Sequence, residues 1–212
     1  MVSASARQLP MAGQVYLDHI AWMAPDMTTA EGVLERLGLT LTPYSIHANR
    51  NPETGRMEPV GTANRLAMLP EGYLEILAPT GEVETRLSAH VRHCIGRHVG
   101  VHLAAFAVAD AEAEAHRIEA AGFTMEPNAD LRRTIEGADG SGVEVSFTVV
   151  RPAFEQFPEG RTQMLSHHTP EHMWQRRFLP VENPLQALLE VSYVVDNPVD
   201  VAARFARFLG RP

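Results

Sequence analysis

The sequence predicts an α+β fold made of two tandem βαβββ modules, with a partial third module at the C-terminus. The main observation is an internal repeat: residues 17–41 and 101–125 both run from an alternating apolar stretch, through an aspartate and a helical pattern, to a glycine. Asp26 and Asp110 are 84 residues apart, and the two glycines keep this spacing. In both copies an extended stretch and two strand-like runs follow, which completes a module.

The first module opens with a strand and a helix. On the strand, alternation places His19 on one face and the apolar Ile20 and Trp22, assigned to the core, on the other. The helix has apolar residues at helical spacing and ends at Gly38, a typical C-cap. Three further strands are expected in LTLTPYSIHA, ANRLAMLP and GYLEILAP.

The second module repeats this order, with later strands in TMEPNADLRRTI, VEVSFTVVRP and RTQMLSHHTP. Between the modules, EVETRLSAHVRHCIGRH has one apolar side and predicts a linking helix. The expected boundaries are a flexible tail at 1–14, the first module at 15–80, the linking helix at 81–99, the second module at 100–180 and a partial third βα unit at 181–212.

The C-terminal residues 189–210 repeat the strand, acidic turn, helix and glycine once more. A lone strand and helix cannot bury their apolar faces by themselves. This piece must therefore dock on the modules, pair with another chain as a homodimer, or belong to a longer protein. The last two readings are favoured equally.

All 18 basic residues are arginines, so the chain contains no lysine. Schiff-base enzymes, pyridoxal phosphate enzymes and Walker-type phosphate loops need a lysine amine and are excluded. The formal net charge of −8 leaves no large basic face for a phosphate backbone, so no nucleic-acid partner is expected.

The single cysteine, Cys94, cannot form an internal disulfide, which suits a reducing compartment. No apolar run approaches the length of a signal peptide core or of a membrane span. We therefore expect a cytoplasmic protein without a membrane partner.

Three stretches, LDHIAWMAPD, GTANRLAMLPEGYLEILAP and HHTPEHMWQRRFLP, resemble the glyoxalase-like domain proteins of the vicinal oxygen chelate superfamily. This superfamily includes glyoxalase I, extradiol dioxygenases, and fosfomycin and bleomycin resistance proteins. The resemblance covers roughly residues 15–210. It implies that the mixed sheets of the two modules pair around a cleft, with metal ligands on the first and last strands of each module.

Carried over by position, the resemblance implies His19, Glu75 and His167 as ligands of a divalent metal, with zinc, iron, manganese and nickel all compatible. A carboxylate among the apolar residues of GYLEIL is costly to bury unless a cation or hydrogen bonds compensate it. The second module departs from the pattern, because Leu103 stands at the position of His19. His102 beside it remains an alternative or additional ligand.

Proton transfer needs a base near the metal, and His168 and Glu171 follow the expected ligand directly. The same residues have a structural reading, since Thr169 and Pro170 suit the first positions of a helix.

Candidate substrate-binding residues are Asn64, Arg65 and Trp174. Arg65 offers a planar donor for an anionic group, and Trp174 is expected to wall the cleft. Their structural alternatives are a surface ion pair for Arg65 and core packing for Trp174.

The function implied by this resemblance is a metal-dependent enzyme of lyase or isomerase type, acting on a small oxygen-chelating substrate in the cleft between the modules. Two alternatives stay open. One is a metal-free small-molecule binding protein of the bleomycin-resistance type, and the other is an extradiol-type dioxygenase.

Overall fold

The structure is a computed structural model that describes residues 7–50, 53–180 and 185–211. It divides into two compact units. The first-module unit holds His19–His102 and Arg176–Ala187, and the second-module unit holds Leu103–Gln175 together with segments from both ends of the chain, Met1–Asp18 and Leu188–Pro212. The expected tail at 1–6, part of a loop at 51–52 and the start of the third unit at 181–184 lie outside the described residues.

The first module has the predicted βαβββ order. Its strands are arranged β2-β3-β4-β1, with antiparallel neighbours except for the parallel pair of β1 and β4. The helix α2 follows the module, as expected for the linking segment. The elements are β1 (Val15–Met23), α1 (Met27–Arg36), β2 (Ser45–Arg50), β3 (Met57–Met68), β4 (Tyr73–Pro79) and α2 (Arg86–Arg97).

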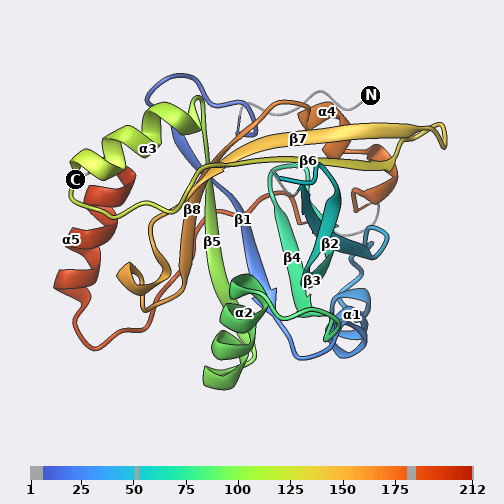
Figure 1. The fold of residues 1–212 in the computed structure, drawn as a ribbon, viewed down its shortest axis with the longest axis horizontal. Coiled ribbons are helices and arrows are strands. Elements are labelled where there is room, and N and C mark those ends of the chain that lie inside the picture. The colour runs from blue at the N-terminus through green and yellow to red at the C-terminus, as the bar shows by residue number, and fades with distance from the viewer. Residues whose placement is uncertain (1–6, 51–52, 181–184, 212) are drawn as a thin grey trace. The chain divides into compact units, whose positions relative to one another are not determined.

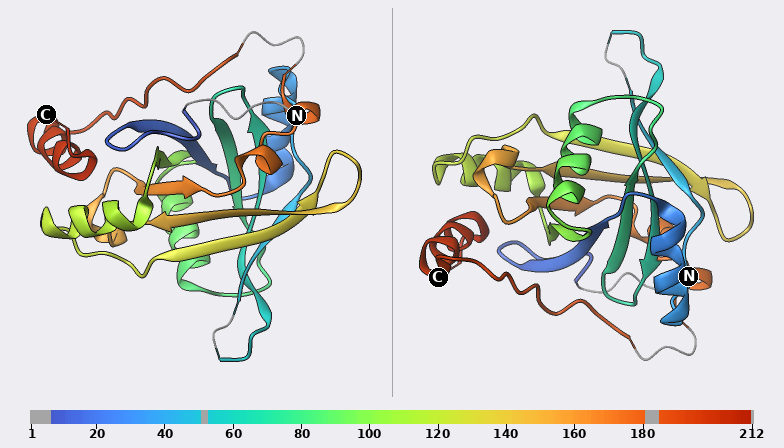
Figure 2. Two further views of the ribbon diagram at one scale, coloured as in Figure 1. Left: turned by 90° about the horizontal axis from the view of Figure 1, so that it is seen from above. Right: turned by 90° about the horizontal axis from the view of Figure 1, so that it is seen from below.

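The second module repeats this topology with the strand order β5-β8-β7-β6, in which β5 and β8 are parallel. Figures 1 and 2 show β6 and β7 as a long hairpin. The elements are β5 (Gly100–Val108), α3 (Ala111–Ala120), β6 (Ala129–Glu136), β7 (Gly142–Val150), η1 (Phe154–Gln156), β8 (Arg161–His167), α4 (Pro170–Met173) and α5 (Pro198–Leu209). The short helix η2 (Arg176–Phe178) lies between α4 and α5 in the chain and belongs to the first-module unit.

Local interactions explain why the repeat folds twice in the same way. Asp26 caps α1 by accepting from the backbone N–H of Thr29, and Asp110 caps α3 through the N–H of Ala113. Gly38 and Gly122 follow these helices with φ of 76° and 91°, a region that favours glycine. The predicted tandem βαβββ fold is confirmed.

The face of β1 that is buried differs from the prediction. Trp22 is 39% exposed, whereas Ala21 and Met23 are fully buried. Both faces of this strand carry apolar residues, so alternation separates the two faces but does not decide which one is packed. The assignment of Trp22 to the core was wrong, and His19 lies on the packed face.

The C-terminal helix docks on the second module of the same chain. Phe208 is completely buried in a cluster with Ile118, Phe123 and Phe157. Arg117 of α3 donates to the carbonyl oxygens of the last turn of α5, and Figures 1 and 2 show these two helices side by side. The strand expected before α5 is not formed in residues 188–195, which have no regular structure.

Residues 7–14, expected to be a flexible tail, contact the second-module unit. Gln8 is buried, and Arg7 donates to the carbonyl oxygen of Leu188 at 2.9 Å. Among the described helices, none has both the length and the apolar character needed to cross a membrane.

Candidate functional site

Two of the three candidate metal ligands share one face of the first-module sheet. In the parallel pair of β1 and β4, His19 is opposite Tyr73, and Ala21 is opposite Glu75. Residues two apart on a strand point the same way, so His19 and Glu75 lie on a common face. Both are buried, with Glu75 at 9% exposure. This part of the ligand arrangement agrees with the alternation expected from the sequence.

Only one oxygen of the Glu75 carboxylate accepts a hydrogen bond from the described residues. The Asn64 side-chain amide donates to Oε1 at 2.7 Å, and no partner for Oε2 is found in the described part of the chain. A buried carboxylate with an open oxygen retains the capacity to bind a cation. Asn64, a candidate substrate-binding residue, thus contacts this carboxylate directly.

The His19 imidazole stacks on Tyr73, with ring centroids 4.4 Å apart and an interplanar angle of 14°. Since Tyr73 is buried at the start of β4, this contact restricts rotation of the imidazole. Both candidate ligands of the first module are therefore oriented by neighbours on adjacent strands.

The third candidate, His167, ends β8 in the second-module unit. Its Nε2 lies 2.8 Å from Oδ2 of Asp18, and both side chains are almost inaccessible to solvent. The Trp174 ring meets this imidazole edge-on at 5.0 Å. Because Asp18 already engages Nε2, metal binding by His167 requires Nδ1 or the displacement of Asp18.

His168 belongs to a different face of the β7–β8 sheet. Its Nε2 lies 2.9 Å from Oγ1 of Thr148, which in turn donates to Asp130 at 2.7 Å. Thr148 is opposite Ser166 in the ladder, so it shares the face of Ser166 and not that of His167. The consecutive histidines thus point to opposite sides of the sheet.

This chain of hydrogen bonds defines the tautomer of neutral His168. A carboxylate only accepts, so the single hydroxyl hydrogen of Thr148 is used by Asp130. The hydroxyl oxygen then accepts from the Nε2–H of His168, which leaves Nδ1 unprotonated. His168 and Glu171 are both exposed, and Glu171 lies in the first turn of α4.

The remaining candidates have structural partners. Arg65 pairs with Glu31 at 3.1 Å and donates through Nε to the carbonyl oxygen of Thr42 at 2.7 Å. Trp174 is almost fully buried. Pro170 starts α4 as expected, but the Thr169 side chain caps nothing there and accepts from the N–H of Ser146 instead.

His102, the alternative ligand, is 1% exposed. Its Nε2 lies 2.8 Å from the carbonyl oxygen of His98, and its Nδ1 has no partner. Burial lowers the pKa of His102 below its ordinary value, although the hydrogen bond to His98 opposes this change. The lowered pKa favours the neutral imidazole of His102, and its contacts lie within the α2–β5 connection.

In the ranges that the structure describes, no three histidine, cysteine, aspartate or glutamate side chains gather into one metal-binding group. The donor chemistry of His19 and Glu75 nevertheless fits a divalent ion, since an imidazole and an open carboxylate oxygen share one face. Sequence reasoning missed several buried polar residues, among them Asp18, the partner of His167, and Arg161 and Gln163 of β8. Alternation alone did not separate them from solvent-facing residues.

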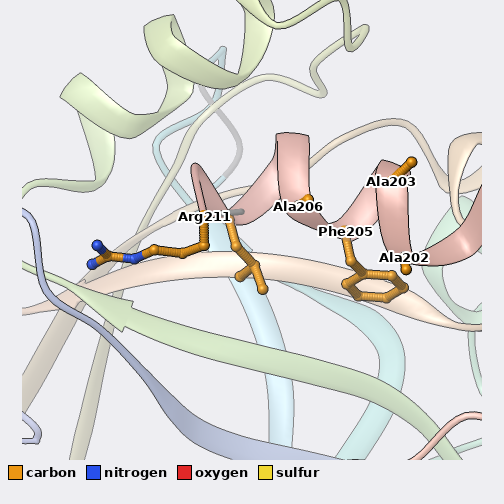
Figure 3. A pocket seen from close by; sticks show the side chains of 6 residues that line it. Ala202, Ala203, Phe205, Ala206 and Arg211 are labelled. Carbon is orange, nitrogen blue, oxygen red and sulfur yellow. The ribbon is translucent and has the colours of Figure 1, made fainter.

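A shallow hollow lies along α5 of the second-module unit (Figure 3). It is lined by Arg211 and otherwise by apolar side chains, those of Ala202, Ala203, Phe205, Ala206 and Leu209. Arg211 donates to the carbonyl oxygen of Gly13. The hollow therefore offers an apolar surface and lacks a group for acid–base chemistry.

Solved structures with a similar fold share little sequence with this chain. A hypothetical protein from Staphylococcus aureus matches with a TM-score of 0.52 and 12% identity, over 73% of this chain and 60% of that chain. Methylmalonyl-CoA epimerase from Streptomyces coelicolor matches with a TM-score of 0.49 and 21% identity, over 72% of this chain and 97% of that one. At these identities the likeness concerns the fold alone.

A family comparison is more specific. No functionally curated protein matches the chain significantly. The model of the glyoxalase-like domain, however, matches residues 17–209, which is nearly the whole chain. The expected resemblance is confirmed, and the chain belongs to the glyoxalase-like domain family.

Proposed function

We propose that this protein is a divalent-metal-dependent enzyme of the lyase or isomerase type, acting on a small oxygen-chelating substrate. The observation that supports it best is the buried pair of His19 and Glu75 on one face of neighbouring strands. Glu75 keeps one carboxylate oxygen without a partner among the described residues. This oxygen is not completely shielded from solvent, so it stays accessible to a cation.

His19 and Glu75 would hold the metal, with His167 as the proposed third ligand. Two imidazoles and one carboxylate form a donor set that leaves positions open for substrate oxygens. A divalent ion held in this way would act as a Lewis acid on those oxygens.

The surrounding residues of this chain have positioning roles. The Asn64 amide fixes the Glu75 carboxylate, and Tyr73 limits rotation of the His19 ring. Such neighbours raise metal affinity because they hold the ligand atoms in place before the metal binds.

For proton transfer, His168 and Glu171 remain the proposed acceptors. Thr148 and Asp130 leave Nδ1 of His168 free to take a proton. Because His168 and His167 point to opposite sides of the sheet, one metal-bound substrate cannot contact both, so His168 as the base is an alternative to His167 as a ligand.

A metal-free binding protein is the second candidate function. It is favoured by the bond of Asp18 to Nε2 of His167 and by the absence of a three-residue metal group in the described ranges. In that case the hydrogen bond between Asn64 and Glu75 has a structural role only, and the small molecule binds without a metal acting as a Lewis acid.

Elemental analysis of protein purified without a histidine tag distinguishes the metal-dependent enzyme from the metal-free binding protein. We expect stoichiometric metal in the wild type and loss of metal in His19→Ala and Glu75→Gln. Glutamine keeps an oxygen that accepts from Asn64, so the Glu75→Gln variant should fold. His116→Ala serves as a matched control because His116 is exposed on α3.

Stoichiometric metal in the wild type and in His116→Ala, absent from both site variants, would support the enzyme. Wild-type protein without metal, even after incubation with zinc, iron, manganese and nickel salts, would refute it and favour the binding protein. Metal retained at wild-type levels in Glu75→Gln would refute the ligand assignment.

A further inference from the structure

Arg161 differs from every other arginine in the described ranges, because it alone falls among the buried residues. It is the first residue of β8 and lies opposite Leu103 of β5. Only 7% of the residue is exposed. An arginine stays charged at any physiological pH, so its guanidinium carries a full positive charge in this buried position.

No carboxylate in the described part of the chain forms an ion pair with this guanidinium. The guanidinium of Arg161 makes no ion pair or hydrogen bond there, and its Nε is completely buried without a partner. Other partly covered arginines are paired: Arg117 contacts Glu114, and Arg204 contacts Glu159. A buried charge without a partner is strongly unfavourable, and proteins rarely keep one without a use.

One contact fixes the orientation of the guanidinium. The guanidinium carbon of Arg161 lies 4.9 Å from the centroid of the Phe154 ring in η1. A cation–π contact of this kind is weaker than an ion pair, and it uses the face of the guanidinium. The N–H groups point outward in the plane of the guanidinium, so this contact leaves the N–H edge available for an anion.

A second polar side chain stands on the same face of β8. Gln163 is two residues further along the strand, so it points the same way as Arg161, roughly 7 Å away along the strand. It is 7% exposed, and its amide, which makes no hydrogen bond in the described ranges, keeps some contact with solvent. Two side chains with open hydrogen-bonding capacity, from two buried residues, therefore line one face.

We propose that Arg161 and Gln163 bind a small organic acid, with the carboxylate on the Arg161 guanidinium and a carbonyl or hydroxyl oxygen further along the ligand on the Gln163 amide. The planar fork of arginine matches a carboxylate through two parallel hydrogen bonds. This inference deepens the proposed function by giving the chemical class of the substrate, and it rests on that function only for the reaction that follows binding.

This assignment moves the anion-binding role away from Arg65. Glu31 and the Thr42 carbonyl already occupy the guanidinium of Arg65, whereas Arg161 lacks any such partner among the described residues. An anionic ligand gains the most binding free energy where it pairs with a buried charge that has no other partner. Arg161 meets this condition in the described ranges.

The test is a titration with pyruvate, with inorganic phosphate as the second arm and sodium chloride at matched ionic strength as the reference. The readouts are the NMR signal of the Arg161 Nε–H group and the thermal midpoint of unfolding. We expect a saturable shift of this signal and a rise of the midpoint with pyruvate, because a ligand that binds only the native state stabilises it.

Arg161→Met and Arg161→Gln test the residue itself, and Arg132→Met is the matched control, since Arg132 forms an exposed pair with Glu144. We expect both Arg161 variants to raise the Kd for pyruvate about 30-fold or more. Arg161→Met should also raise the thermal midpoint without ligand, because it removes an uncompensated buried charge. The control should bind as the wild type does.

The proposal would be overturned by no saturable response of the wild type to pyruvate, by a response to phosphate alone, or by wild-type affinity in both Arg161 variants. The titration is repeated after chelator treatment. Binding that disappears with the metal would place the anion on the metal and also overturn the proposal. A wild type that takes up no metal from added salts and still binds pyruvate through Arg161 would refute the metal-dependent function alone.

Discussion

The two modules have the same topology but carry different polar residues. In each module the first and last strands are parallel neighbours, and an aspartate caps the helix. On the face that holds the candidate ligands, however, the first module presents His19 and Glu75, while the second presents Leu103, Arg161 and His167. The repeat therefore preserves the backbone and changes the chemistry.

Matched positions show why this divergence is tolerated. Asp18 and His102 are 84 residues apart, like the two capping aspartates, and both are buried. Asp18 bonds to His167, whereas His102 bonds to the carbonyl oxygen of His98. A β-ladder needs only the backbone groups, so any side chain that finds a partner satisfies the position.

The largest expected effect is a loss of stability when α5, the helix that packs only on the second module, loses its buried ring. Replacing Phe208 by alanine removes a fully buried ring from the cluster with Phe123 and Phe157. We expect the free energy of unfolding to fall by about 3–5 kcal/mol. Denaturant unfolding followed by Trp174 fluorescence, in a Trp22→Phe background, reports on the second module.

The control for this prediction is Val199→Ala on the same helix, because Val199 is exposed. It should change the free energy of unfolding by no more than about 0.5 kcal/mol. Equal effects of the two substitutions would contradict the docking of α5 on this module.

A smaller effect, on metal affinity, should distinguish a residue that positions a metal ligand from the ligand itself in the first module. Asn64→Ala removes the amide that holds Glu75, so we expect metal affinity to fall about 10- to 100-fold. Competition with a chromophoric chelator measures this affinity. Arg65→Gln, next to it in β3, should leave the affinity unchanged because Arg65 contacts Glu31 instead.

If Asn64→Ala binds metal as tightly as the wild type while Glu75→Gln loses it, the carboxylate needs no positioning. The orienting role of Asn64 would then be rejected, and the role of Glu75 as a ligand would remain.

The smallest effect concerns His102, which stands where the first module has Asp18. Burial lowers the folded-state pKa of His102 below its ordinary value of 6.5, so the unfolded chain binds more protons just below that pH. The free energy of unfolding should therefore decrease as the pH falls from about 6.5 towards the folded pKa, and this contribution should level off below it.

His102→Gln should flatten this part of the pH profile, whereas His116→Gln, at an exposed position of α3, should not. Denaturant unfolding at a series of pH values gives the comparison. An unchanged slope in His102→Gln would show that other groups cause the pH dependence.

Several features were predictable because they depend on residues close together in the chain. The capping aspartates bond to N–H groups three residues away, and the glycines after the helices adopt positive φ locally. Alternation likewise placed His19 and Glu75 on a common face. The same reasoning failed for Trp22, because both faces of β1 are apolar and their coverage depends on distant segments.

The sequence by itself determined the repeat, the order of strands and helices, the family and the exclusion of lysine chemistry, because periodicity and local hydrogen bonds carry that information. The tertiary structure decided which polar groups meet. Asp18 reaches His167 across 149 residues of sequence, and Arg65 finds Glu31 while Arg161 finds no carboxylate in the described ranges. Such pairings depend on which distant segments the fold brings together, and a local sequence pattern does not contain this information. They also determine which buried charged groups remain available to bind a ligand.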